Sequence, residues 1–126
     1  MVMQIKPQQR FAGMFILLAM VIAISPRIAL AHAVLLSSTP QKNVTVSGPE
    51  IAISLKYNSR VDGARSTLSL LKPDGTVENV GGLTQPRPDV LSATGHGLAK
   101  GAYILRWQVL SSDGHITRGE VPFQVK

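Results

Sequence analysis

The chain has 126 residues, with 13 Lys and Arg against 7 Asp and Glu, so its formal net charge is +6. The basic residues are scattered and form no run, which argues against a nucleic-acid-binding surface. There is no cysteine, so disulfide bonds, thiolate metal ligands and a lipid-anchored cysteine are all excluded.

The first 31 residues have the features of a cleaved signal peptide. Lys6 and Arg10 supply a positive start, and residues 11–24 are uncharged and mostly apolar. Residues 29–31 read Ala-Leu-Ala, a small-residue cleavage pattern. The apolar stretch of fourteen residues is short against the roughly 20 that span a bilayer, so we favour cleavage over an uncleaved anchor. We therefore predict a signal peptide over 1–31 and an exported mature chain over 32–126 that does not span the membrane.

The predicted mature chain has 95 residues, the length of one domain. Lys6, Arg10 and Arg27 leave with the signal peptide, so ten basic residues remain against seven acidic ones and the net charge becomes +3. All four methionines precede residue 21. The mature chain therefore has neither a thiol nor a thioether.

Short runs with alternating apolar and polar residues follow, separated by Gly and Pro. Such runs occupy residues 51–57, 103–109 and 121–125 and predict half-buried strands. Residues 72–75, Lys-Pro-Asp-Gly, predict a hairpin turn between strands. No segment shows a period of 3.6 residues. About seven short strands therefore predict an all-β fold, a Greek-key sandwich or barrel that is immunoglobulin-like or cupredoxin-like.

Three further positions carry structural predictions. Trp107 and Phe123 lie on the inward phase of their strands, which predicts that both belong to the core. Pro122 lies on the outward phase and has no N–H, which predicts an edge or a bulge at that position.

His32, Asp113 and His115 are candidate metal ligands. An N-terminal histidine can chelate a metal through its amine nitrogen and its Nδ1. Asp113 and His115 are two residues apart, so they share a face if the segment is extended. Three nitrogens and one carboxylate oxygen favour Cu(II), whereas zinc more often takes a tetrahedral set that commonly includes Cys.

The residues alone leave another interpretation open. His32 is then a solvated terminus, and residues 113–115 form a turn in which the aspartate caps its own backbone.

The segments 32–40, 101–109, 111–119 and 121–125 together resemble the CopC family of periplasmic copper-binding proteins. The resemblance implies a seven-stranded Greek-key fold and one Cu(II) ion per mature chain, bound by His32, Asp113 and His115. It also implies a role in copper homeostasis or resistance, with an inner-membrane copper transporter of the CopD type as a partner. Some members carry a Met-rich loop for Cu(I), which nothing here matches. His96 matches no motif of the family and is interpreted as a surface-loop histidine.

Two other functions are kept beside this prediction of a binding protein that is not an enzyme. A copper monooxygenase also uses an N-terminal histidine with a second histidine, but Asp113 would fill the metal position that catalysis needs open. A metal-free immunoglobulin-like interaction module would make the terminus unimportant.

Overall fold

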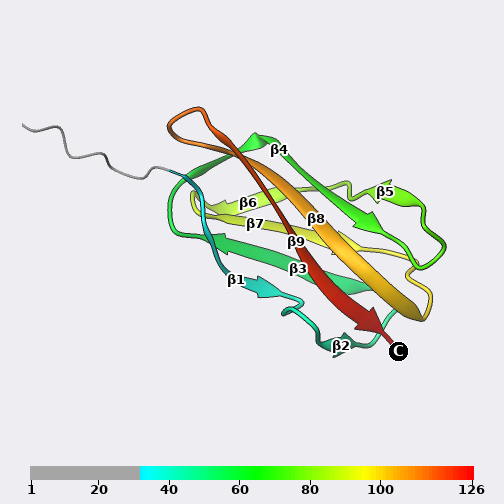
Figure 1. Cartoon of the computed structure of the whole chain (residues 1–126). Coiled ribbons are helices and arrows are strands. Elements are labelled where there is room, and N and C mark those ends of the chain that lie inside the picture. Colours follow the sequence, from blue (N-terminus) through cyan, green and yellow to red (C-terminus); the bar gives the residue numbers. More distant parts are fainter. Residues whose placement is uncertain (1–31) are drawn as a thin grey trace, which may run out of the picture. The chain divides into compact units, whose positions relative to one another are not determined.

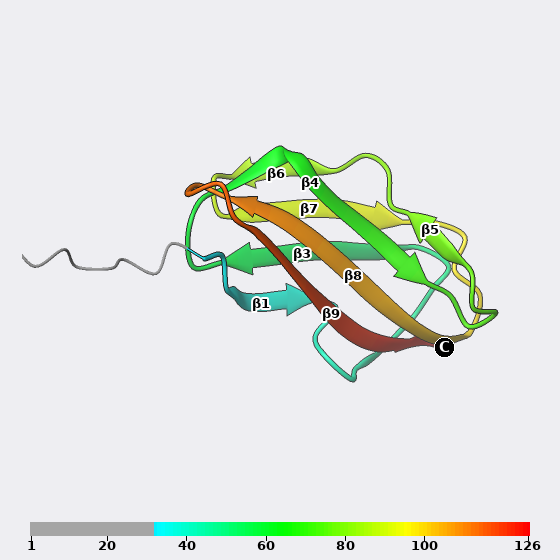
Figure 2. The same ribbon diagram turned by 45° about the horizontal axis from the view of Figure 1, so that its top comes forward.

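The computed structural model describes residues 32–126, which form two β-sheets packed face to face (Figures 1 and 2). The predicted signal peptide lies outside the described residues. The first sheet has the order β1 (Leu35–Thr39), β3 (Ile51–Tyr57), β7 (Val90–Gly95) and β6 (Thr84–Arg87). The second has the order β2 (Thr45–Val46), β9 (Ile116–Val125), β8 (Gly101–Ser111), β4 (Val61–Leu71) and β5 (Val77–Asn79). Among residues 32–126, no helix is long and apolar enough to cross a membrane.

The core lies between the sheets and is built from the predicted alternation. In β3, β8 and the second half of β9, every second side chain is buried. Trp107 is only 7% exposed and Phe123 only 2%, so both predicted core aromatics are confirmed. The all-β sandwich is confirmed with them.

The chain has more strands than the seven predicted, since nine are present in the described part. Three short strands, β2, β5 and β6, produce no alternating pattern, and β5 has three exposed residues. β2 has two residues, and all four residues of β6 are exposed. The chain crosses from one sheet to the other five times: on either side of β2, between β3 and β4, between β5 and β6, and between β7 and β8.

Two local predictions are also confirmed. Between β4 and β5, the Gly75 N–H donates to the Lys72 carbonyl over 3.0 Å, which closes the predicted turn. At Pro122 the carbonyl accepts from the Asn43 N–H. A strand residue points its N and its carbonyl to the same side, so the missing N–H of Pro122 faces the edge of β9 that β2 leaves open.

One end of the sandwich collects four segments that are distant in sequence. Residues 32–34 and the β3–β4, β6–β7 and β8–β9 connections all lie at the left end of both views (Figures 1 and 2). The described chain therefore starts beside the β8–β9 turn, which carries Asp113 and His115.

Candidate metal centre

His32 is positioned by the two residues that follow it. The Ala33 side chain is 1% exposed and belongs to the core. The Val34 N–H donates to Oδ1 of Asn58 over 2.8 Å, and the Asn58 N–H donates to the Val34 carbonyl over 2.9 Å. These contacts attach the segment to the β3–β4 connection, which fixes where the His32 imidazole can lie.

Asp113 and His115 lie in a tight turn between β8 and β9. The Ser111 N–H donates to the His115 carbonyl over 2.8 Å, and the Gly114 N–H donates to the Ser111 carbonyl over 2.9 Å. Gly114 has φ of +85°, in the region that favours glycine. The segment is not extended, because β8 ends at Ser111, and the turn instead brings the two side chains together.

The Asp113 carboxylate is held by three hydrogen-bond donors. Oδ1 lies 2.6 Å from the Ser111 hydroxyl and accepts the His115 N–H over 3.0 Å, while Oδ2 lies 2.8 Å from His115 Nδ1. These contacts, the Ser111 hydroxyl first, hold the pKa of Asp113 well below its usual range. The carboxylate is therefore ionised throughout the neutral and mildly acidic range.

The aspartate-capped turn is thus realised, and it is compatible with a metal site. One potential ligand atom from each of His32, Asp113 and His115 lies within 4.8 Å of the others. The two imidazole rings have centroids 4.9 Å apart and planes inclined by 56°. All three residues are exposed, so an ion can reach them from solvent. Two imidazoles and one carboxylate suit Cu(II) or Zn(II) better than Mg²⁺ or Ca²⁺.

The sequence predicted the three side chains but missed two that position them. Asn58 holds the start of the chain, and nothing in the local sequence links it to residue 34. The Ser111 hydroxyl contacts Asp113 and also lies 2.8 Å from the His115 carbonyl, and its only signal was its place in the Ser-Ser-Asp-Gly-His segment. His96 is exposed and lies outside the cluster, with Nδ1 3.1 Å from the Glu50 carboxylate.

Comparisons with known proteins agree with this fold. The sequence profile of the CopC domain matches residues 35–126. Copper resistance protein C of Xanthomonas campestris pv. juglandis is 32% identical over 111 residues, which cover 78% of this chain and 83% of that protein. The crystal structure of CopC from Methylosinus trichosporium OB3b is 31% identical, with a TM-score of 0.67 over 75% of this chain and 94% of that one. PcoC from Escherichia coli, described as a methionine-rich copper resistance protein, is 27% identical, with a TM-score of 0.64 over 76% of this chain and all of that one.

Proposed function

Since the chain belongs to the CopC family, we propose that it is a periplasmic copper-binding protein that holds one Cu(II) ion per mature chain. The observation that carries the proposal is the cluster of His32, Asp113 and His115 at one end of the sandwich. Removal of residues 1–31 would add the α-amino nitrogen of His32. The complete ligand set would then be that amine, two imidazoles and one carboxylate.

The donor chemistry supports Cu(II) over Cu(I). Nitrogen and carboxylate oxygen are the donors that Cu(II) prefers, whereas Cu(I) prefers thiolate and thioether sulfur. Residues 32–126 contain neither Cys nor Met, in contrast to the methionine-rich relative PcoC. We therefore propose a single Cu(II) site without a second, sulfur-based Cu(I) site.

A binding role is favoured over polymer oxidation. With the amine, the proposed ligands would fill four positions, and a catalytic metal needs one of them open. The four aromatic residues of the described chain, Tyr57, Tyr103, Trp107 and Phe123, are all buried. They supply no flat surface for a polysaccharide. We propose storage, tolerance or delivery of copper in the periplasm, with a CopD-type membrane transporter as the partner.

Copper titration of single-histidine variants tests this function. We expect His115→Ala to weaken Cu(II) binding by orders of magnitude in competition with a chelator of known affinity. His96→Ala is the matched control, because His96 is also exposed but pairs with Glu50. It should bind copper as the unaltered protein does. Equal Cu(II) affinity in the two variants would contradict the site, and a preference for Zn(II) or Cu(I) over Cu(II) would contradict the assigned ion.

A further inference from the structure

A second feature at the same end of the sandwich is an open hollow of about 520 Å³. Arg60 of the β3–β4 connection and Arg87 at the end of β6 line it, together with Val61, Pro86, Pro88 and Ser112. Ser112 immediately precedes the candidate ligand Asp113. The hollow is thus beside the candidate metal centre but uses none of its three ligands.

The two arginines of the hollow differ from the other three in the described chain. Arg65 pairs with Asp62, Arg106 donates to Glu120 over 3.1 Å, and Arg118 donates to Gln108 over 2.7 Å. Within residues 32–126, the guanidinium groups of Arg60 and Arg87 have neither a hydrogen-bond acceptor nor an ionic partner. Two guanidinium groups without partners therefore border one hollow.

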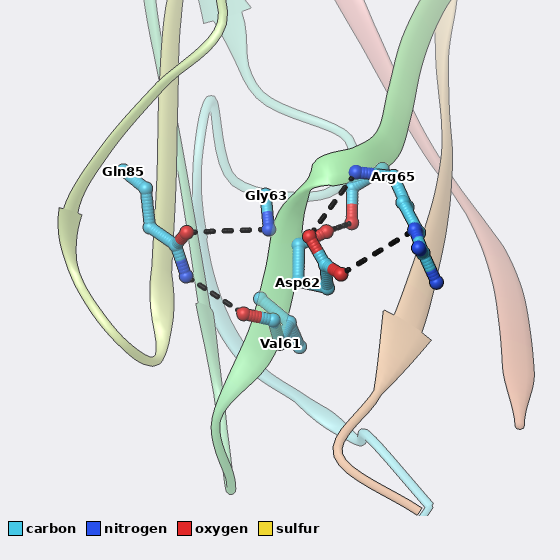
Figure 3. Close-up of polar contacts among 6 residues, drawn as sticks. Val61, Asp62, Gly63, Arg65 and Gln85 are labelled. Carbon is cyan, nitrogen blue, oxygen red and sulfur yellow. Dashed lines mark hydrogen bonds and ion pairs between the residues drawn. The ribbon is translucent and has the colours of Figure 1, made fainter. Parts of the chain in front are cut away.

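The two segments that carry these arginines are held together by the side chain of Gln85, which links β6 of one sheet to β4 of the other. We call this link the Gln85 clip. β4 has a bulge after Asp62. Asp62 pairs with Leu110 of β8 and Thr67 pairs with Gln108, so β4 advances by five residues where β8 advances by two. Figure 3 shows the Gln85 side chain reaching this bulge from β6. Its amide donates to the Val61 carbonyl over 2.8 Å and to the Pro88 carbonyl over 3.0 Å, while its Oε1 accepts the Gly63 N–H over 3.2 Å. A Cβ at Gly63 would lie 2.5 Å from Gln85 Oε1, so the clip needs glycine there.

Asp62 is the one acidic residue that lines the hollow, and it contacts Arg65. Asp62 Oδ1 accepts the Arg65 N–H over 3.3 Å, and Oδ2 lies 3.9 Å from Arg65 Nε (Figure 3). The lining residues thus carry two positive charges against one negative charge, and Arg65 offsets part of the latter, so the hollow has a net positive charge.

We propose that this hollow binds a carboxylate-bearing ligand, either a small polycarboxylate or an acidic side chain of a partner protein. Guanidinium groups bind carboxylates with paired, charge-assisted hydrogen bonds. Val61, Pro86 and Pro88 offer apolar walls to the carbon skeleton of such a ligand, which inorganic phosphate lacks. The proposal is independent of the copper function, because none of the proposed copper ligands lines the hollow.

Titrations of metal-free protein, expressed with its own leader, test the proposal by calorimetry and by amide chemical shifts. Citrate probes the small-molecule source, and a blocked peptide with two adjacent glutamates probes the protein source. We expect at least one to bind, to shift the amides of residues 60–62 and 85–88, and to weaken as salt is added. Inorganic phosphate should bind more weakly.

Variants that each remove one positive charge distinguish binding in the hollow from nonspecific electrostatic attraction to the protein surface. Arg60→Gln and Arg87→Gln should each weaken the bound probe by about tenfold, the scale of a lost charge-assisted contact. Arg118→Gln removes the same charge from β9, outside the hollow, where the guanidinium contacts only the neutral Gln108. It should change the affinity by less than about twofold. Binding of neither probe, tighter binding of phosphate, or equal losses in all three variants would overturn the proposal. Thermal midpoints of the exposed-site variants verify that each one is folded.

Discussion

Ser111 connects the two candidate ligands of the β8–β9 turn. Its side chain is buried, being 3% exposed, and its hydroxyl lies within hydrogen-bonding distance of both Asp113 Oδ1 and the His115 carbonyl. One hydroxyl proton serves one acceptor at a time. When it serves Asp113, it fixes the orientation of the carboxylate, as partners of metal ligands commonly do.

Ser111→Ala should therefore weaken copper binding without unfolding the protein. The expected loss is about 10- to 100-fold in affinity, the usual effect of removing a group that orients a metal ligand. Chelator competition measures it. Ser112→Ala is the control, because it removes a hydroxyl from the same turn that does not contact Asp113. Equal losses in both variants would contradict the positioning role of Ser111.

The pH dependence of copper affinity should come from the nitrogen ligands, which must lose a proton to bind the metal, and not from Asp113. The low pKa of Asp113 keeps the carboxylate ionised above its usual value of 3.8. The ionised Asp113 carboxylate stabilises the folded turn at pH values above 3.8, and this stabilisation is lost only as the pH falls through the lower pKa of the folded state. An α-amino group has a pKa of about 7.7–8.0 and must lose its proton to bind metal.

Copper affinity should thus fall by at least about tenfold per pH unit below about 7.7. Competition titrations at about pH 7.5 and about pH 6 measure this slope. A flat profile over this interval would contradict amine ligation, because a bound amine must compete with protons there.

At the scale of the strands, the alternation of apolar and polar residues predicted the strands that have one buried face. It missed the strands whose residues are all exposed. Ile53, Leu105 and Phe123 lie in three different strands, and in each strand the residues that face the core recur at every second position. β6 has four exposed residues, so its place in the sheet depends on backbone pairing and on the Gln85 clip. No pattern of side chains along the sequence can indicate either of these.

In the candidate site, too, some residues could be predicted from the sequence and others could not. His32, Asp113 and His115 could be predicted because their chemistry is visible in the sequence. The contact between Asn58 and Val34 spans 24 residues. Arg60 and Arg87 line one hollow only because the β3–β4 connection and the end of β6 lie at the same end of the sandwich. Such contacts depend on tertiary packing and leave no local signal.

Gly119 in β9 lies opposite Trp107 in β8, and a Cβ there would overlap the indole ring. Gly119→Ala should therefore destabilise the domain by about 1–3 kcal/mol through overpacking. At roughly 4–8 °C per kcal/mol for this size, the change is measurable by thermal unfolding followed by the fluorescence of the single tryptophan. Gly81→Ala is the control, because a Cβ at Gly81 has nothing within 4 Å. Equal midpoints in the two variants would show that the indole can move aside.

At the scale of the whole molecule, the candidate centre joins residue 32 to a turn more than 80 residues later. The core holds both parts, through Ala33 on one side and the buried residues of β8 and β9 on the other. We therefore expect the sandwich to fold without metal. In the proposed function, removal of the signal peptide then completes the ligand set by exposing one nitrogen.

Processing should consequently control copper binding without controlling the fold. A chain that retains one extra residue before His32 places the amine nitrogen in a peptide bond, so it can no longer chelate together with Nδ1. We expect its Cu(II) affinity to fall by several orders of magnitude while its β-sheet circular dichroism and thermal midpoint stay unchanged. Electron paramagnetic resonance should count fewer coordinated nitrogens than in the chain that starts at His32, and intact mass establishes each first residue. An unchanged spectrum and affinity in the extended chain would refute the amine chelate and leave only the side chains of His32, Asp113 and His115 to hold the ion.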